Sequence, residues 1–134
     1  HTNYEGKAKA AVDVLLKEGY DFVYVHVEAP DEMGHQGSID RKVKAIEYLD
    51  EKVIRPVKKA MDASGEDYRM LILPDHPTPI ACRTHTSDPI PYLLYDSTDT
   101  GIKTETAQYN EKQAAAGGIL VSEGYRLIEK LLEE

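Results

Sequence analysis

A run of alternating valines and aromatic residues, Asp21–Val27 (DFVYVHV), limits the folds open to this chain more than any other segment. β-branched and aromatic residues favour strands. Both faces of the run are apolar enough to be covered, as the faces of a parallel sheet are. Two further apolar runs, Arg69–Leu73 and Tyr92–Tyr95, are also predicted strands. The chain is therefore expected to build a sheet with helices packed on it.

Helical patterns alternate with these strands. The predicted helices cover residues 4–18, 39–57, 110–116 and 122–132. Pro56 is expected to kink the second helix or end it early, and Ala29–Gly37 and Asp96–Thr106 are predicted to be a turn and an irregular segment. The resulting order predicts an α/β fold with a mostly parallel sheet and helices on both faces.

Five residues of the types that bind metals, aspartate and histidine, lie in three short turns of the chain. In open α/β sheets, ligands bind beyond the carboxyl ends of the strands, and two of the turns directly follow predicted strands. We therefore predict that these side chains gather at one edge of the sheet. They are Asp31, His35, Asp75, His76 and His85.

The spacing of these residues bears on how they would share ions. Asp31 and His35 are four residues apart, and a bent loop can turn both onto one ion. Asp75 and His76 are adjacent, so they would serve different ions or bridge two. Carboxylate and imidazole without thiolate suit Mn²⁺, Zn²⁺ or Fe²⁺. Two such ions about 3.5–4 Å apart hold the oxygens of phosphoryl transfer. Each pair taken alone is more typical of a solvated loop than of a metal site.

Charge and cysteine content exclude several classes of protein. The formal net charge is −8, which disfavours nonspecific binding to nucleic acid or to an anionic membrane. No apolar run approaches the roughly 20 residues of a membrane span. Cys82 is the only cysteine, so no intrachain disulfide forms, as expected for the reducing cytoplasm. The first residue is His1, which suggests a processed, truncated or cloned fragment.

Several stretches of the chain carry a family resemblance. They are TNYEGKA (2–8), DFVYVHVEAPDEMGHQG (21–37), KAIEYLDEKVI (44–54), LPDHPTPI (73–80), RTHTSDPIPYLLY (83–95) and the end at 109–132. Together they resemble the C-terminal part of the archaeal-type, cofactor-independent (2,3-bisphosphoglycerate-independent) phosphoglycerate mutases of the alkaline phosphatase superfamily.

The resemblance implies a two-metal phosphotransferase, usually containing manganese, with zinc or magnesium as alternatives. Asp31, His35 and His85 would bind one ion, and Asp75 and His76 the other. The family moves the phosphoryl group of 3-phosphoglycerate onto an enzyme serine and returns it to the 2-position, so the implied partner is a small phosphorylated substrate.

The chain departs from the complete family pattern. The family's nucleophilic serine, a further metal-binding aspartate and an inserted substrate domain have no counterpart here. Residues 1–134 are therefore expected to be the C-terminal portion of the metal-binding, phosphatase-like domain. The isolated piece is expected to be inactive without the remainder of the parent chain and to hold at most the ion at Asp31, His35 and His85.

Other interpretations stay open. The parent could be a related superfamily phosphotransferase, such as a proposed homoserine kinase, or a phosphatase, and the chain could be a non-catalytic metal-binding domain. Arg83 could bind a substrate phosphate or form a structural ion pair. His26 is interpreted as a hydrogen-bonded strand residue rather than a ligand. Glu28 and Glu32 could orient an imidazole or be solvated.

Overall fold

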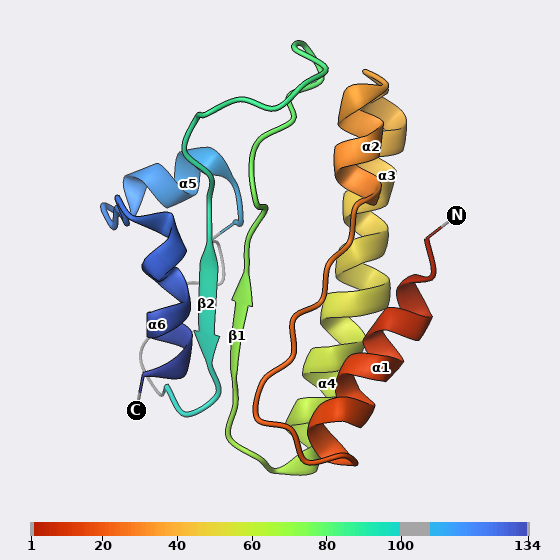
Figure 1. The fold of residues 1–134 in the computed structure, drawn as a ribbon, viewed down its shortest axis with the longest axis vertical. Helices are drawn as coiled ribbons and strands as arrows, with labels where there is room; N and C mark the ends of the chain where they lie inside the picture. Colours follow the sequence, from red (N-terminus) through yellow and green to blue (C-terminus); the bar gives the residue numbers. More distant parts are fainter. Residues whose placement is uncertain (1, 100–107, 134) are drawn as a thin grey trace. The chain divides into compact units, whose positions relative to one another are not determined.

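The computed structural model describes residues 2–99 and 108–133, which fall into two compact units (Figure 1). The first unit spans His1–Glu66 and Thr78–Thr86, and the second spans Asp67–Pro77 and Ser87–Glu134. Most of the irregular segment predicted at 96–106 lies outside the described residues. None of the helices in the described ranges has the length and apolar character that a membrane span needs.

Helix α1 (Tyr4–Leu16) confirms the first predicted helix. The Asn3 side chain caps it, because Asn3 Oδ1 accepts a hydrogen bond from the Gly6 N–H at 3.0 Å. Residues at helical spacing then turn one face of α1 toward the core. The buried members of that face are Tyr4, Ala8 and Ala11.

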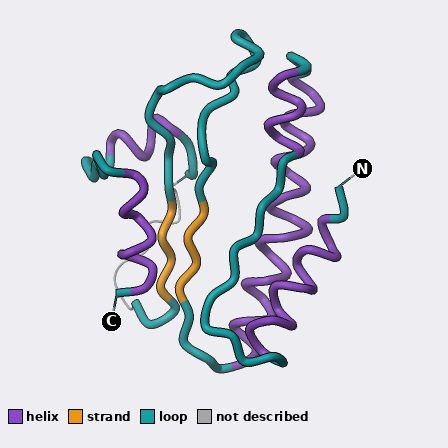
Figure 2. The backbone as a smooth tube through the Cα atoms, viewed as in Figure 1, coloured by secondary structure: helices purple, strands orange, loops and turns teal. Residues whose placement is uncertain are grey.

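The strand predicted at Asp21–Val27 is not formed in the described structure, where the segment is a loop (Figure 2). Its side chains still alternate: Val25 and Val27 pack on the helices of the first unit, whereas Phe22 and Tyr24 are exposed. The pattern therefore orients the side chains, but a strand also needs a hydrogen-bonded neighbour, which no described segment supplies. The mostly parallel sheet expected from this run is accordingly absent from the described residues.

The turn predicted at Ala29–Gly37 is instead a short helix, α2 (Ala29–His35). Pro30 is typical of turns, but it lies in the first turn of α2, where its fixed φ and missing N–H suit a helix. The helix stops before Gly37, whose φ of +67° lies in the left-handed region. This correction matters because α2 carries two of the predicted ligands.

The long helix predicted after Ser38 forms as three consecutive segments: α3 (Ile39–Leu49), the π-helical segment η1 (Asp50–Ile54) and α4 (Arg55–Ser64). The expectation that Pro56 ends the helix early is wrong. Pro56 lies in the first turn of α4, directly after the wider η1 turn, and π turns are one of the ways in which a helix accommodates a disruption of its ladder.

The core of the first unit lies between α1 and the long helix. Small and aromatic residues dominate it, and the Tyr4 and Tyr48 rings are 5.8 Å apart between centroids. The buried cluster consists of Tyr4, Ala8, Ala29, Ala45 and Val53. This packing fixes the base of α2 through Ala29, and so places the rest of α2 on a rigid support.

The second unit is built on an antiparallel pair, β1 (Arg69–Ile72) and β2 (Leu93–Asp96). Both strands confirm predicted runs, but their orientation differs from the expected parallel one. Residues 73–92 contain no helix, so they lack the helical crossover that usually connects parallel strands. Arg69 pairs with Asp96 in the register, and the Arg69 Nε lies 3.0 Å from Asp96 Oδ2.

Short helices complete the second unit. Helix α5 (Glu111–Ala116) confirms its prediction, and Asn110 Oδ1 caps it by accepting from the Gln113 N–H at 2.8 Å. The predicted last helix divides into the 3₁₀ turn η2 (Gly124–Arg126) and α6 (Leu127–Leu132). The Arg69 guanidinium joins β1 to α6 by donating to the Leu131 carbonyl at 3.3 Å.

Candidate metal centre

Helix α2 places Asp31 and His35 on one face, because side chains four residues apart in a helix lie one turn above each other. The His35 Nε2 is 3.4 Å from Asp31 Oδ2. The sequence predicted that these residues would meet through a bent loop, and the structure brings them together through a helix instead.

His85 reaches the same place from a loop of the first unit. Its Nε2 lies 3.2 Å from His35 Nε2, although the two residues are 50 positions apart, and 3.3 Å from Asp31 Oδ1. The predicted grouping of Asp31, His35 and His85 is thus present within one unit. We call these three residues the ligand group.

The His35 ring is held in one orientation by the backbone. Its Nδ1 lies 3.0 Å from the Arg83 carbonyl oxygen, and since a carbonyl only accepts, Nδ1 must carry the proton. A neutral His35 therefore presents the Nε2 lone pair to the ligand group, an arrangement common among metal-bound histidines. Arg83 has a φ of +54°, a conformation that non-glycine residues seldom adopt.

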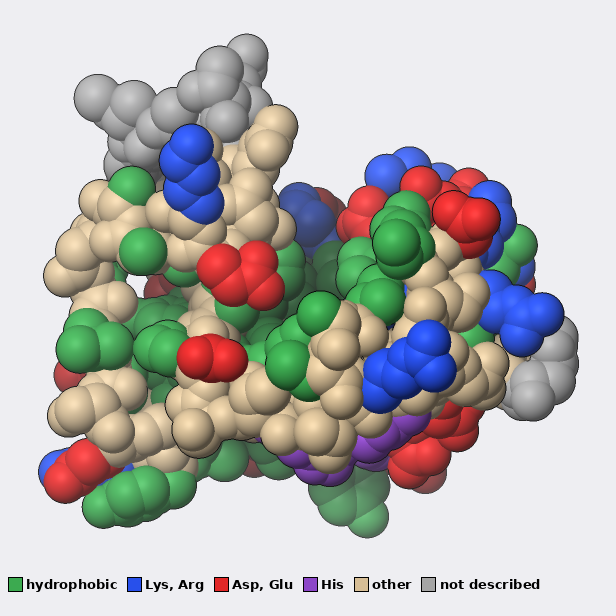
Figure 3. All heavy atoms as spheres, turned by 90° about the horizontal axis from the view of Figure 1, so that it is seen from above, with side chains coloured by type: hydrophobic (Ala, Val, Ile, Leu, Met, Phe, Trp, Pro, Cys, Tyr) green, Lys and Arg blue, Asp and Glu red, His purple; other side chains and the backbone are tan. Residues whose placement is uncertain are grey.

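The spacing of the ligand group fits a small divalent cation. Nitrogen and oxygen ligands about 2.0–2.2 Å from a tetrahedral ion lie roughly 3.3–3.6 Å from one another. The two imidazole nitrogens here are 3.2 Å apart, and each approaches a different oxygen of Asp31, His85 at 3.3 Å from Oδ1 and His35 at 3.4 Å from Oδ2. The side chains of His35 and His85 are 42% and 52% exposed, and histidine side chains reach the molecular surface in Figure 3. The group can therefore receive an ion from solvent without rearrangement of the fold.

One supporting residue was missed by the sequence analysis. Thr78 is buried, with 5% of its surface exposed, and its hydroxyl donates to Asp31 Oδ1 at 2.5 Å. The sequence gives no periodic signal for this contact, because Thr78 lies in an irregular loop 47 residues from Asp31. The flanking Pro77 and Pro79 restrict the backbone of this loop.

Asp75 and His76 belong to the second unit. They contact each other, with His76 Nε2 at 3.2 Å from Asp75 Oδ2 and the His76 N–H donating to Asp75 Oδ1 at 3.0 Å. The convergence of Asp75 and His76 with the ligand group stays a prediction.

The remaining candidates have mixed outcomes. Arg83 is exposed, and its guanidinium fills the space beside Gly37, where a Cβ would collide with it. His26 is hydrogen bonded as predicted, since its Nδ1 is 3.5 Å from the Tyr24 hydroxyl, although its segment is not a strand. The Glu28 carboxylate lies 3.6 Å from His26 Nε2. Glu28 therefore contacts the imidazole of His26, which is outside the ligand group.

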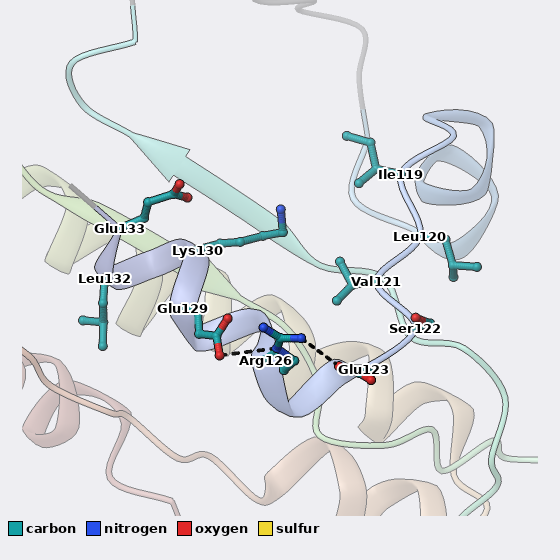
Figure 4. Close-up of a pocket in the computed structure, with 10 residues that line it drawn as sticks. All are labelled: Ile119, Leu120, Val121, Ser122, Glu123, Arg126, Glu129, Lys130, Leu132 and Glu133. Atoms are coloured by element: carbon teal, nitrogen blue, oxygen red, sulfur yellow. Dashed lines mark hydrogen bonds and ion pairs between the residues drawn. The ribbon is translucent and has the colours of Figure 1, made fainter.

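A larger open hollow of about 760 Å³ lies in the second unit, between the segment after α5 and α6 (Figure 4). It contains none of the five predicted ligands. Its Arg126 guanidinium is already paired with Glu123 at 3.2 Å and Glu129 at 3.4 Å. Lys130 also lines the hollow, beside the carboxylates of Glu123, Glu129 and Glu133. Because the hollow contains no imidazole among its lining residues, the ligand group is the better candidate metal site.

Comparison with known proteins agrees with a metal-binding role. The family model that describes the Metalloenzyme superfamily matches residues 1–123. A Geobacter sulfurreducens protein named as a probable 2,3-bisphosphoglycerate-independent phosphoglycerate mutase is 46% identical over 132 residues, which are 98% of this chain and 32% of that protein. A Methanosarcina barkeri protein named as the same mutase is 48% identical over 121 residues, or 89% of this chain and 29% of its own.

A solved structure is also similar. A Pyrococcus horikoshii protein superposes with a TM-score of 0.80 at 29% identity, covering 98% of this chain and 38% of its own. The chain spans about a third of the length of the curated relatives that it matches.

Proposed function

Since the chain belongs to the Metalloenzyme superfamily, we propose that it is the metal-binding C-terminal portion of a 2,3-bisphosphoglycerate-independent phosphoglycerate mutase. The full enzyme would interconvert 3-phosphoglycerate and 2-phosphoglycerate through a phosphoserine intermediate. The observation that carries the proposal is the ligand group, with donor atoms 3.2–3.4 Å apart, in a chain 46% identical to a relative named for this activity.

Two divalent ions are part of the proposal, with Mn²⁺ favoured and Zn²⁺ or Mg²⁺ as alternatives. Asp31, His35 and His85 would hold one ion, and Asp75 and His76 would hold part of the shell of the other. Ions bound in this way supply positive charge to phosphoryl oxygens and lower the pKa of a serine hydroxyl.

The residues of the ligand group each have a defined task. The Arg83 carbonyl fixes His35 so that Nε2 faces the site. Asp31 presents its two oxygens in different directions, Oδ2 toward His35 and Oδ1 toward His85. Because both imidazoles are about half exposed, the site stays open on one side, as catalytic metal sites require for substrate oxygens.

The remainder of the full-length enzyme is the proposed partner of this chain. The nucleophilic serine and the missing metal ligands would come from it, so the isolated chain is expected to be inactive. Large apolar side chains of the first unit are exposed, and burying them against another segment would be favourable. They include Tyr20, Phe22, Tyr24, Ile39, Val43 and Ile46.

The substrate would be recognised locally rather than by the overall field. A net charge of −8 repels a phosphorylated acid, so bound metal and nearby cations must supply the attraction. The exposed Arg83 guanidinium is the proposed contact to a phosphate. We place the enzyme in the cytoplasm, because a single cysteine, Cys82, fits a reducing compartment.

A chimeric enzyme tests the proposal. The matching segment of the Geobacter sulfurreducens relative, 132 residues long, is replaced by this chain, and the product is assayed with Mn²⁺ and 3-phosphoglycerate. We expect 2-phosphoglycerate to form, and His35→Ala to remove most of the activity. His26→Ala is the matched control, because it deletes an exposed imidazole of the same unit outside the ligand group.

Other outcomes identify other functions. Phosphoryl transfer from ATP to homoserine, or release of free phosphate without 2-phosphoglycerate, would contradict the mutase assignment. Metal binding by a folded chimera without any turnover would support a non-catalytic role instead. Circular dichroism and a Mn²⁺ titration of each chimera distinguish lost chemistry from lost structure.

A further inference from the structure

Thr78 is the one buried polar residue within the described ranges. It lies in a loop between two prolines, Pro77 and Pro79, which restrict the backbone on either side. Burial of a hydroxyl is costly unless the hydroxyl is hydrogen bonded. Thr78 meets that condition through a contact with Asp31, a member of the ligand group.

The contact between Thr78 and Asp31 restrains a carboxylate that would otherwise rotate. The Thr78 Oγ1 donates to Asp31 Oδ1 at 2.5 Å, a length typical of strong hydroxyl–carboxylate bonds. The same Oδ1 faces His85 at 3.3 Å, and Oδ2 faces His35 at 3.4 Å. With Oδ1 fixed, the plane of the carboxylate is fixed, and each oxygen keeps its own imidazole.

The backbone of Thr78 is itself held from two helices. The Lys42 ammonium, from α3, donates to the Thr78 carbonyl oxygen at 2.7 Å. On the α2 side, Gly34 leaves the space that Thr78 occupies, because a Cβ at position 34 would come within 2.5 Å of that carbonyl oxygen and 3.0 Å of Thr78 Cγ2. The hydroxyl is therefore supported by the same helices that carry and flank Asp31.

We propose that Thr78 is a positioning residue for the metal centre, with Lys42 and Gly34 holding it in place. The proposal rests on the proposed function, because it takes the ligand group to bind a divalent ion. Thr78 acts by pre-orienting Asp31, so that binding an ion does not require the carboxylate to be ordered at the same time. Removing such a supporting contact typically weakens metal binding about 10–100-fold.

The test compares two substitutions of Thr78, one that keeps the shape of the side chain and one that keeps its hydroxyl. Thr78→Val preserves the shape of the side chain and removes the hydroxyl, whereas Thr78→Ser preserves the hydroxyl and removes a methyl group. We expect calorimetric titration of the chain with Mn²⁺ to give about 10–100-fold weaker binding for Thr78→Val. Thr78→Ser should remain within a few-fold of the unaltered chain.

A matched control lies in the second unit. Thr98 also donates its hydroxyl to an aspartate, Asp96 Oδ1, at 2.6 Å, but none of the predicted ligands is involved. Thr98→Val should leave the Mn²⁺ affinity unchanged. The electron paramagnetic resonance spectrum of bound Mn²⁺ adds a readout of geometry, which we expect to change for Thr78→Val only.

The outcomes separate the two hypotheses. Failure of the unaltered chain to bind Mn²⁺, or equal affinity in the chain and in His35→Ala, would overturn the proposed metal centre. If His35→Ala weakens binding while Thr78→Val does not, the metal centre stands and the role of Thr78 is wrong. If Thr78→Val unfolds, Lys42→Met provides the second test, because it loosens the Thr78 backbone and keeps the hydroxyl, and unchanged affinity would count against the proposal.

Discussion

The two units present their candidate ligands in different ways. In the first unit, Asp31 and His35 come from successive turns of one helix, and His85 joins them from a loop 50 residues away from His35. In the second, Asp75 and His76 are neighbours in the chain and contact each other. Only the first arrangement fixes donors from separate elements relative to one another, which is what a preorganised metal site needs.

A pair of Thr–Asp contacts makes the same distinction. Thr78 and Asp31 are 47 residues apart, and their contact orients a candidate ligand. Thr98 and Asp96 are two residues apart, and their contact closes a local turn while lowering the pKa of Asp96 to about 2. Two hydrogen bonds of similar length therefore have different structural effects. One joins distant parts of the chain, and the other stabilises a local turn.

The largest expected effect concerns the cores of the two units. Met61 in α4 and Leu127 in α6 are each 5% exposed, so Met61→Ala and Leu127→Ala should each lower the free energy of unfolding by about 2–5 kcal/mol. Urea denaturation measures both. Ile119→Ala, at a site 71% exposed, is the control and should change stability by about 0.5 kcal/mol or less. A negligible cost at Leu127 would mean that the second unit lacks a packed core.

The next effect compares a histidine of the ligand group, His35, with His76 of the second unit. His35→Ala should weaken binding of the first Mn²⁺ ion to this chain by roughly 100-fold or more, since loss of a direct ligand exceeds loss of a supporting contact. His76→Ala should weaken it by less than about tenfold on the same scale. Isothermal calorimetry measures both, and equal losses would show that the second unit contributes to the same ion.

The smallest effect is the pH dependence of the β1–β2 pair. Bonds from the Thr98 hydroxyl and N–H, followed by one from Arg69, lower the pKa of Asp96 from 3.8 to about 2. Because the folded pKa is depressed, the stabilisation is fully present above about pH 4 and is lost as the pH falls through the folded value. Carbon NMR titration of the Asp96 carboxyl should show its pKa rising toward 3.8 in Thr98→Val. An unchanged titration would remove Thr98 as the main cause.

Local signals predicted most of the elements correctly. The periodicity and caps of α1 and α5 need nothing outside their own segments, and they formed as expected. The strand at Asp21–Val27 failed because its valines can be half-buried against helices without a ladder partner. Helix α2 was missed because Pro30 has one meaning in a turn and another in the first turn of a helix.

The sequence predicted that Asp31, His35 and His85 lie together, as they do, but it did not predict the contact that supports them, and their role as metal ligands stays a prediction. Residue type and spacing were enough to group Asp31 with His35, since the two are one helical turn apart. The positions of the predicted strands placed His85 at the same edge of the sheet, and only the resemblance to a family assigned it to the same ion as Asp31 and His35. The role of Thr78 depends on a contact between residues 47 positions apart in the chain. No pattern in a single sequence predicts such a contact.

The π-helical segment η1 has a consequence for the whole helix from Ile39 to Ser64. A π turn holds more residues than an α turn, so it acts as a one-residue insertion and rotates everything after it by roughly 100°. Before η1, Ile39, Val43 and Ile46 are 64%, 50% and 51% exposed. Within η1, Val53 is only 6% exposed. The apolar face of the helix therefore points in two directions: after the π turn it is buried against α1, whereas before it the apolar stripe is exposed.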